Sequence, residues 1–246
     1  MNQGSKRAIL LVFALFCSTG LFAAASTDPL WQKALAVSRT NSDWIAGLVI
    51  TRSAVIYKGE TNGAHELWQR TSLGKDGHMI TETVKVIEEG KDVTKEELKK
   101  EKSKRKKTAS AGNQGGGGPF SAAVQDRLSL TLTNRTRNID GKECVGYLFE
   151  LRNTNGPITR GVAWLEKATG IPAELENVTF DPLPDKHLKG MSVTTRYEST
   201  SDGAWRVKEM RTTGKVSMFL IKADIQSTMS FSEYWRRPRR HKEQKD

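Results

Sequence analysis

Two histidines and an aspartate around one turn are the first candidates for chemistry in this sequence. His65 and His78 stand on either side of a predicted hairpin, and Asp76 lies in the turn between them. Imidazole and carboxylate groups are typical zinc ligands. The stretch His65–Gln69, however, has glutamine where the H-E-x-x-H motif has its second histidine, and no further ligand can be named. We therefore expect no metal site and no bound cofactor.

Other catalytic chemistry also lacks its usual residue pattern. The sequence has no G-x-S-x-G, no Walker loop and no C-x-x-C motif. Cys144 has no histidine near it in sequence that would act as a base. The four glycines at 115–118 follow a charged segment instead of a strand, so the context of a phosphate-binding loop is missing. We expect a protein that is not an enzyme.

The net charge of the 246-residue chain is +11, but its basic excess is local. Residues 1–25 contribute two positive charges, residues 91–107 contribute five, residues 236–246 contribute four, and the rest is neutral. A nucleic-acid-binding domain would need a basic face on its folded part. We therefore expect no nucleic-acid binding. Lys91–Lys107 and Arg236–Lys245 are interpreted as solvated segments or, alternatively, as basic arms that contact an anionic membrane surface.

The first 25 residues have the pattern of a secretory signal. Met1–Arg7 is basic, Ala8–Phe16 is an unbroken apolar run, and Ala23–Ala25 supplies small residues before Ser26. The apolar run is too short for a transmembrane helix, which needs about 20 residues. We expect export with cleavage before Ser26, which leaves Cys144 as the only cysteine and excludes an internal disulfide.

Hydrophobic residues alternate with polar ones over most of the remaining chain. Asp28 and Pro29 first begin a short amphipathic helix over Leu30–Val37. About eleven strands follow, separated by turn residues such as Asn62-Gly63 and Thr213-Gly214. Strands joined by tight turns pair antiparallel. The expected strands are 44–57, 66–73, 78–87, 127–138, 143–152, 159–166, 173–180, 191–199, 205–212, 215–225 and 228–235.

The alternation places apolar side chains on one face of these strands. Val145, Tyr147, Phe149 and Leu151, for example, share one side of their strand. One short helix is too small to cover so many strands, so a curved sheet that encloses an apolar cavity is the better physical solution. The fold class expected is mainly β with α, with a single large curved antiparallel sheet. The charged, glycine-rich stretch 91–119 interrupts it as an insertion that contains a helix.

Residues Gly161–Glu176 combine an aromatic-bearing strand, an acidic residue and a Thr-Gly-x-Pro turn, here Thr169–Pro172. This unit resembles one in the LolA/LolB-like periplasmic lipoprotein-carrier superfamily, and the end of the chain, Phe219–Trp235, also looks similar. The resemblance implies an unclosed half-barrel of about eleven strands over residues 26–235. Helices would form a lid, and acyl chains would lie in the apolar cavity.

The resemblance favours a non-enzymatic periplasmic carrier that binds an acyl chain, a lipid or the anchor of an acylated protein. A regulatory envelope-stress sensor of the same fold, which binds a protein partner, is the alternative, and an envelope ester hydrolase is a third. The expected organisation is a signal (1–25), one half-barrel domain (26–235) and a basic tail (236–246). The residues expected to line the cavity are Trp44, Trp68, Leu130, Tyr147, Phe149, Trp164, Val193, Trp205 and Phe219.

Overall fold

The computed structural model describes residues 28–41, 44–104, 118–154, 156–183, 187–201, 203–218 and 221–237. The expected signal, Phe219 and most of the expected basic tail lie outside the described residues. The helices are α1 (Pro29–Asn41), α2 (Thr94–Lys104) and the 3-10 helix η1 (Ala122–Arg127). The strands are β1 (Trp44–Ile45), β2 (Leu48–Tyr57), β3 (Glu60–Leu73), β4 (Met79–Glu88), β5 (Lys91–Asp92), β6 (Leu128–Ile139), β7 (Lys142–Arg152), β8 (Ile158–Glu166), β9 (Pro172–Asp181), β10 (Leu188–Ser199), β11 (Trp205–Met218), β12 (Ile221–Ser232) and β13 (Trp235–Arg236).

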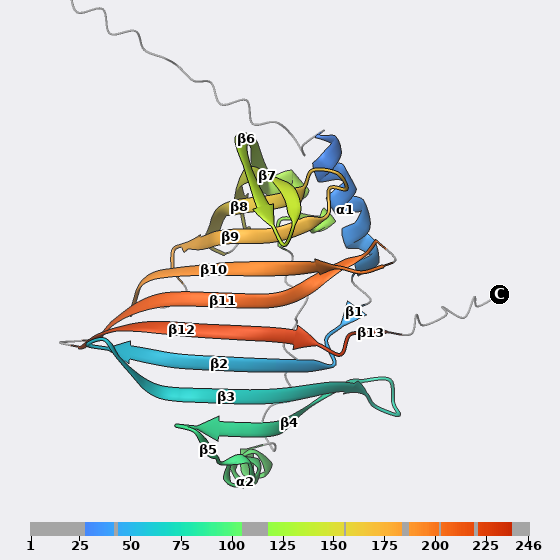
Figure 1. The fold of residues 1–246 in the computed structure, drawn as a ribbon. Helices are drawn as coiled ribbons and strands as arrows, with labels where there is room; N and C mark the ends of the chain where they lie inside the picture. The colour runs from blue at the N-terminus through green and yellow to red at the C-terminus, as the bar shows by residue number, and fades with distance from the viewer. Residues whose placement is uncertain are drawn as a thin grey trace, which may run out of the picture.

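One large curved antiparallel sheet dominates the molecule (Figure 1). It has 11 strands in the order β5-β4-β3-β2-β12-β11-β10-β9-β8-β7-β6, and β1 and β13 form a separate two-stranded sheet. Strands β5 and β6 are its two edges, so the sheet is not closed into a barrel. The expected fold class, a half-barrel of about eleven strands with a few helices, is confirmed.

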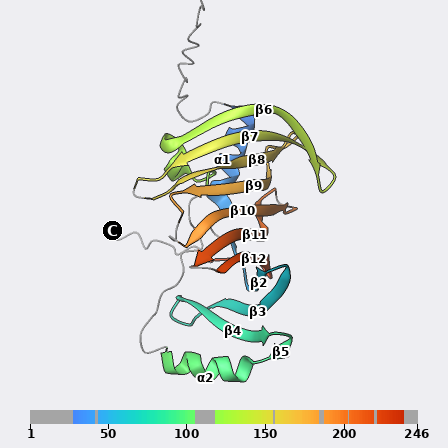
Figure 2. The same ribbon diagram turned by 90° about the vertical axis from the view of Figure 1, so that its left-hand side faces the viewer.

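Within the large sheet, the pairing of strands is local except at one place. Strands that are joined by short turns lie side by side, as such turns require. However, β2 pairs with β12, so Ser53 lies opposite Ser227 in the middle of the sheet. The chain therefore begins and ends its sheet at the centre, and β5 and β6 lie at opposite ends of it (Figure 2).

The first hairpin turns earlier than the sequence predicted. The turn is at Lys58-Gly59, where φ angles of 53° and 84° suit a two-residue hairpin loop, and Tyr57 pairs with Glu60 across it. The predicted turn Asn62-Gly63 lies inside β3, at a bulge where Gly63 has a φ of 61°. The Asn-Gly pair thus bends a strand instead of ending it.

A second predicted turn, Thr213-Gly214, also lies inside a strand. Thr213 pairs with Ser192 on one side and with Gln226 on the other, so β11 continues through it. The predicted strand 215–225 is correspondingly divided, because residues up to Met218 belong to β11 and residues from Ile221 belong to β12. Pairing on both sides holds the strand extended in spite of the glycine.

Helix α1 begins where the sequence predicted. One side-chain oxygen of Asp28 accepts hydrogen bonds from the N–H groups of Leu30 (2.9 Å) and Trp31 (3.1 Å). The β8–β9 turn supports this end, because Gly170 has a φ of +78° and a Cβ there would lie 2.8 Å from the carbonyl oxygen of Leu30. Glycine therefore allows the turn to approach the helix closely.

The charged stretch forms helix α2, which lies against β4 at one end of the sheet (Figure 2). The hydroxyl of Thr94 accepts a hydrogen bond from the N–H of Val86 (2.9 Å), which ties the start of the helix to the strand. The part of the predicted helix beyond Lys104 lies outside the described residues. Among the helices that the structure describes, none has the length and apolar character needed to cross a membrane.

Candidate functional site: the inner face of the sheet

Cross-strand pairing defines one continuous inner face. Because directly paired residues point to the same side of a sheet, a row of pairs can be followed from strand to strand. One such row begins at the β6 edge and ends on β4: Leu132, Tyr147, Ala163, Leu175, Thr195, Met210, Met229, Thr51, Leu67 and Val86. We call the face that carries this row the inner face and the opposite one the outer face.

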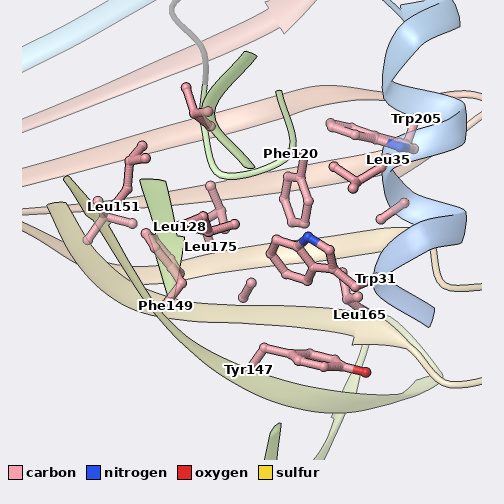
Figure 3. Packing of buried hydrophobic residues seen from close by; sticks show 14 of the residues in the cluster. Trp31, Leu35, Phe120, Leu128, Tyr147, Phe149, Leu151, Leu165, Leu175 and Trp205 are labelled. Atoms are coloured by element: carbon pink, nitrogen blue, oxygen red, sulfur yellow. The ribbon is translucent and has the colours of Figure 1, made fainter. Parts of the chain in front are cut away.

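The β6–β11 half of the inner face is filled by the protein itself. Trp31 and Leu35 of α1 and Phe120 before η1 pack into one buried cluster with side chains of these strands (Figure 3). The Trp31 ring lies 4.9 Å from that of Phe120 and 5.6 Å from that of Tyr147, measured between centroids. A hydrocarbon chain could occupy this half only after α1 and Phe120 had moved.

Two hydrogen-bonded contacts hold this filling in place. The Gln125 side chain of η1 accepts from Trp31 Nε1 (3.1 Å) and donates to the carbonyl oxygen of Pro119 (2.7 Å). The Tyr147 hydroxyl donates to the Asp28 carboxylate (2.9 Å). Burial, together with this bond, raises the pKa of Tyr147 above its ordinary value. The capping residue of α1 is thereby hydrogen-bonded to the inner face of the sheet.

Replacing Asp28 with alanine should lower the free energy of unfolding by about 1–2 kcal/mol, since the helix loses its cap and Tyr147 loses its acceptor. Urea denaturation followed by circular dichroism measures the loss. Asp28→Asn retains an oxygen acceptor and should keep most of the stability; an equal loss in both variants would contradict this role.

The other half of the inner face, on β12, β2, β3 and β4, is less covered. Among the described residues, no member of the filled cluster comes from these four strands. Val55 and Leu73 are each 39% exposed there. Leu67, Met229 and Phe231 are half-buried. Val49 and Val86 of the same face are only 2% exposed, so the accessible apolar surface of this half consists of Val55 and Leu73 and of parts of Leu67, Met229 and Phe231.

The two-stranded sheet borders this open half at one end. Trp235 Nε1 donates to the carbonyl oxygen of Thr71 (3.4 Å), and the N–H of Gly47 donates to the carbonyl oxygen of Glu233 (3.2 Å). Around these residues lies a hollow of about 390 Å³ with Arg70, Leu73, Glu233 and Arg236 in its wall, where Arg70 and Glu233 form an ion pair (3.2 Å). The accessible apolar side chains of this half thus end next to charged side chains of both signs.

The structure separates the residues that the sequence proposed for the cavity. Tyr147, Phe149, Val193 and Trp205 belong to the filled half of the inner face, and Leu130 packs against them. Trp164 and Trp68 lie on the outer face, since they pair in the row Gly146, Trp164, Glu174, Arg196, Glu209, Ser230, Ile50, Trp68 and Lys85. Trp44 lies on β1, with the guanidinium groups of Arg206 and Arg236 at 5.4 Å and 4.7 Å from the centroid of its ring. Phe219 lies outside the described residues.

On the outer face, Trp164 belongs to a network of charged groups. Glu174, only 2% exposed, accepts from Arg137 (3.2 Å) and Arg196 (3.0 Å), and Glu176 accepts from Trp164 Nε1 (2.6 Å). A Cβ at Gly146 would lie 3.1 Å from the Trp164 ring, so glycine makes room for the indole. Each buried carboxylate is paired, which identifies this network as a structural element of the sheet.

The histidines do not form a site together. His65 pairs with Glu88 in β3 and β4, whereas Leu73 pairs with Met79 at the turn end beside His78. At about 3.3 Å per strand residue, eight residues place His65 roughly 26 Å from that turn. Among the described residues, no group of three or more His, Cys, Asp or Glu side chains could hold a metal ion.

The sequence did not reveal Phe120, which fills one half of the inner face, or Leu67 and Met229, which line the other half. Phe120 lies between the expected insertion 91–119 and the expected strand 127–138, in a segment to which no element was assigned. Ser121 there is a capping residue for Ala122–Arg127, and Val124 is buried. Leu67 and Met229 come from strands that meet only through the β2–β12 pairing. Nothing local in either strand signals that neighbour.

Comparisons with known proteins give distant similarities of fold. No protein-family model and no curated protein matches the sequence. An outer membrane lipoprotein-sorting protein domain from Vibrio parahaemolyticus is 15% identical, with 86% of this chain and 95% of that chain covered and a TM-score of 0.32. A LolA superfamily protein from Nitrosomonas europaea is 13% identical, with 85% and 93% covered and a TM-score of 0.33. The MucA/MucB complex of Pseudomonas aeruginosa gives 9% identity, 85% and 98% coverage and a TM-score of 0.23.

LolA superfamily proteins, the group that Gly161–Glu176 resembles, are thus among the solved structures that align with this chain. At these identities and TM-scores, the alignments carry no argument about what the chain binds.

Proposed function

We propose that this chain is a non-enzymatic carrier that binds an acyl chain, a lipid or an acylated protein on the inner face of its half-barrel. One observation carries the proposal: half of the inner face is filled by α1 and Phe120, while the half on β12 and β2–β4 keeps apolar side chains accessible. The sequence pattern of residues 1–25 supports a periplasmic location, with residues 26–235 as the carrier domain.

The energetics suit reversible binding. Burial of about 300 Å² of hydrocarbon at about 25 cal/mol per Å² gives roughly 7 kcal/mol before the costs of association. Such a ligand would be retained during transfer and released to an acceptor. In this proposal, the basic segments Lys91–Lys107 and Arg236–Lys245 bring the carrier to an anionic membrane surface.

A fluorescent fatty-acid displacement assay tests the site. Leu67→Gln should weaken probe binding about fivefold or more, because it places an amide among the apolar side chains of the open half. Val55→Gln, at a more exposed position of the same face, should act in the same direction. Circular dichroism verifies that both variants remain folded.

The matched control is Leu148→Gln, which changes a leucine that is 49% exposed on the outer face. It should leave probe binding unchanged. The proposal fails if the unmodified chain shows no saturable binding and native mass spectrometry finds no lipid. Equal weakening by Leu148→Gln and Leu67→Gln would move the ligand away from the inner face.

A further inference from the structure

The two edges of the sheet differ in how they are protected from pairing with another strand. At one edge, β5 has only two residues, and the lysine-rich helix α2 follows it and lies against β4 (Figure 2). Short strands and lysines are common devices that prevent edge-to-edge association. At the other edge, β6 has 12 residues and, among the strands that the structure describes, pairs with β7 alone.

The first part of β6 is regular and carries no charge. Residues 128–132 pair in unbroken register with β7, and a bulge follows between Leu132 and Thr136. On the inner face of this segment stand Leu128, Leu130 and Leu132, of which Leu132 is 54% exposed. The outer face carries hydroxyl groups. The buried cluster therefore ends at this edge, where the Leu132 side chain is left exposed.

The same segment is complementary to itself. In an antiparallel pair of two β6 strands centred on Leu130, Leu128 of one copy lies opposite Leu132 of the other, and Ser129 lies opposite Thr131. Each exposed Leu132 would then pack on apolar groups, and hydroxyl residues would pair on the outer face. A two-fold axis at this position satisfies both copies identically.

Charge is compatible with the antiparallel arrangement. The ion pair of Asp126 and Arg127 (3.6 Å) precedes β6, and exposed Arg135 lies at its bulge. Antiparallel pairing brings this neutral ion pair of one copy to the Arg135 end of the other. Parallel pairing would bring the two Arg135 side chains together. The pairing also has to end near the bulge, where the strand bends away.

We propose that β6 is a dimerisation edge at which a second copy of this chain adds its own β6 and continues the sheet. The flat contact is five residues long, so the dimer is weak and forms at high protein concentration. The leucines extend the filled half of each inner face and leave the open half free. Dimerisation and ligand binding are therefore independent in this arrangement.

Sedimentation velocity over a concentration series tests the proposal. The purified chain should shift from monomer to dimer as its concentration rises into the high micromolar range. Leu132→Lys should weaken the association at least about tenfold, because it places a charge directly opposite the apolar Leu128 of the second copy. Leu148→Lys changes a leucine of similar exposure on the outer face of β7 and should leave the association unchanged.

Cross-linking tests the register. In chains that begin at Ser26, a mixture of Ser129→Cys and Thr131→Cys should form an intermolecular disulfide with a mild oxidant, because directly opposite Cβ atoms lie about 4.5–5.5 Å apart. The unmodified chain from Ser26, whose Cys144 is buried, should form none. Each variant alone should form much less, because its two cysteines would lie about 7–8 Å apart on a diagonal. A chain that stays monomeric at every concentration, or a dimer that Leu132→Lys leaves intact, overturns the proposal.

Discussion

Replacing Trp31 with alanine should lower the free energy of unfolding by about 3–5 kcal/mol, the range for large aromatic side chains deleted from a core. Trp31 is fully buried, contacts the rings of Phe120 and Tyr147, and donates its indole N–H to Gln125. The substitution removes the contact between α1 and the segment before β6. Urea denaturation followed by circular dichroism measures the loss.

The neighbouring variant Gln32→Ala is the control, because Gln32 is exposed on the same helix. It should change the stability by less than about 0.5 kcal/mol. A loss below about 1 kcal/mol for Trp31→Ala would show that α1 is not docked on the sheet in solution. The filled half would then be accessible to ligands, and the distinction between the two halves would disappear.

Replacing Glu174 with glutamine should cost about 2–3 kcal/mol, which is below the full cost of breaking a buried ion pair. The Glu174 side chain is 2% exposed and paired with Arg137 and Arg196, whose side chains are each 38% exposed. The arginines lose their charged partner, but water can still reach them. Denaturation at low and high salt measures the change.

Glu150→Gln is the matched control for this charge network. Glu150 also accepts from two arginines, Arg152 and Arg160, at 2.8 Å each, but its side chain and theirs are more exposed. Removal of that carboxylate should cost less than about 1 kcal/mol. Similar losses in the two variants would contradict the role of burial at Glu174.

The elements of this fold were largely predictable because they depend on neighbours in sequence. Asp28 caps α1, and the period-two alternation around Tyr147 and Phe149 locates β7 and its apolar face. Errors occurred where a turn signal competed with pairing on both sides, as at Thr213-Gly214. The preference of a Thr-Gly pair for a turn is weak compared with the backbone hydrogen bonds to the strands on both sides.

The candidate site was less predictable, because alternation says only that adjacent residues face opposite sides. The sequence alone could not show that Trp164 lies on the outer face while its neighbours Ala163 and Leu165 are in the filled cluster. That assignment depends on which side another element covers. An aromatic side chain packs equally well among apolar neighbours or against arginines, as Trp164 does here.

By itself, the sequence determined most of the strands, their antiparallel hairpins, the capped helix and the mainly β fold class, because local periodicity and short connections leave few alternatives. The tertiary structure decided that the sheet stays open, that β2 and β12 meet, that α1 and Phe120 fill one half of the inner face, and that β6 is an edge of the sheet in the described part of the chain. These features join residues far apart in the chain. Their free energy comes from contacts that form only when the whole sheet is assembled.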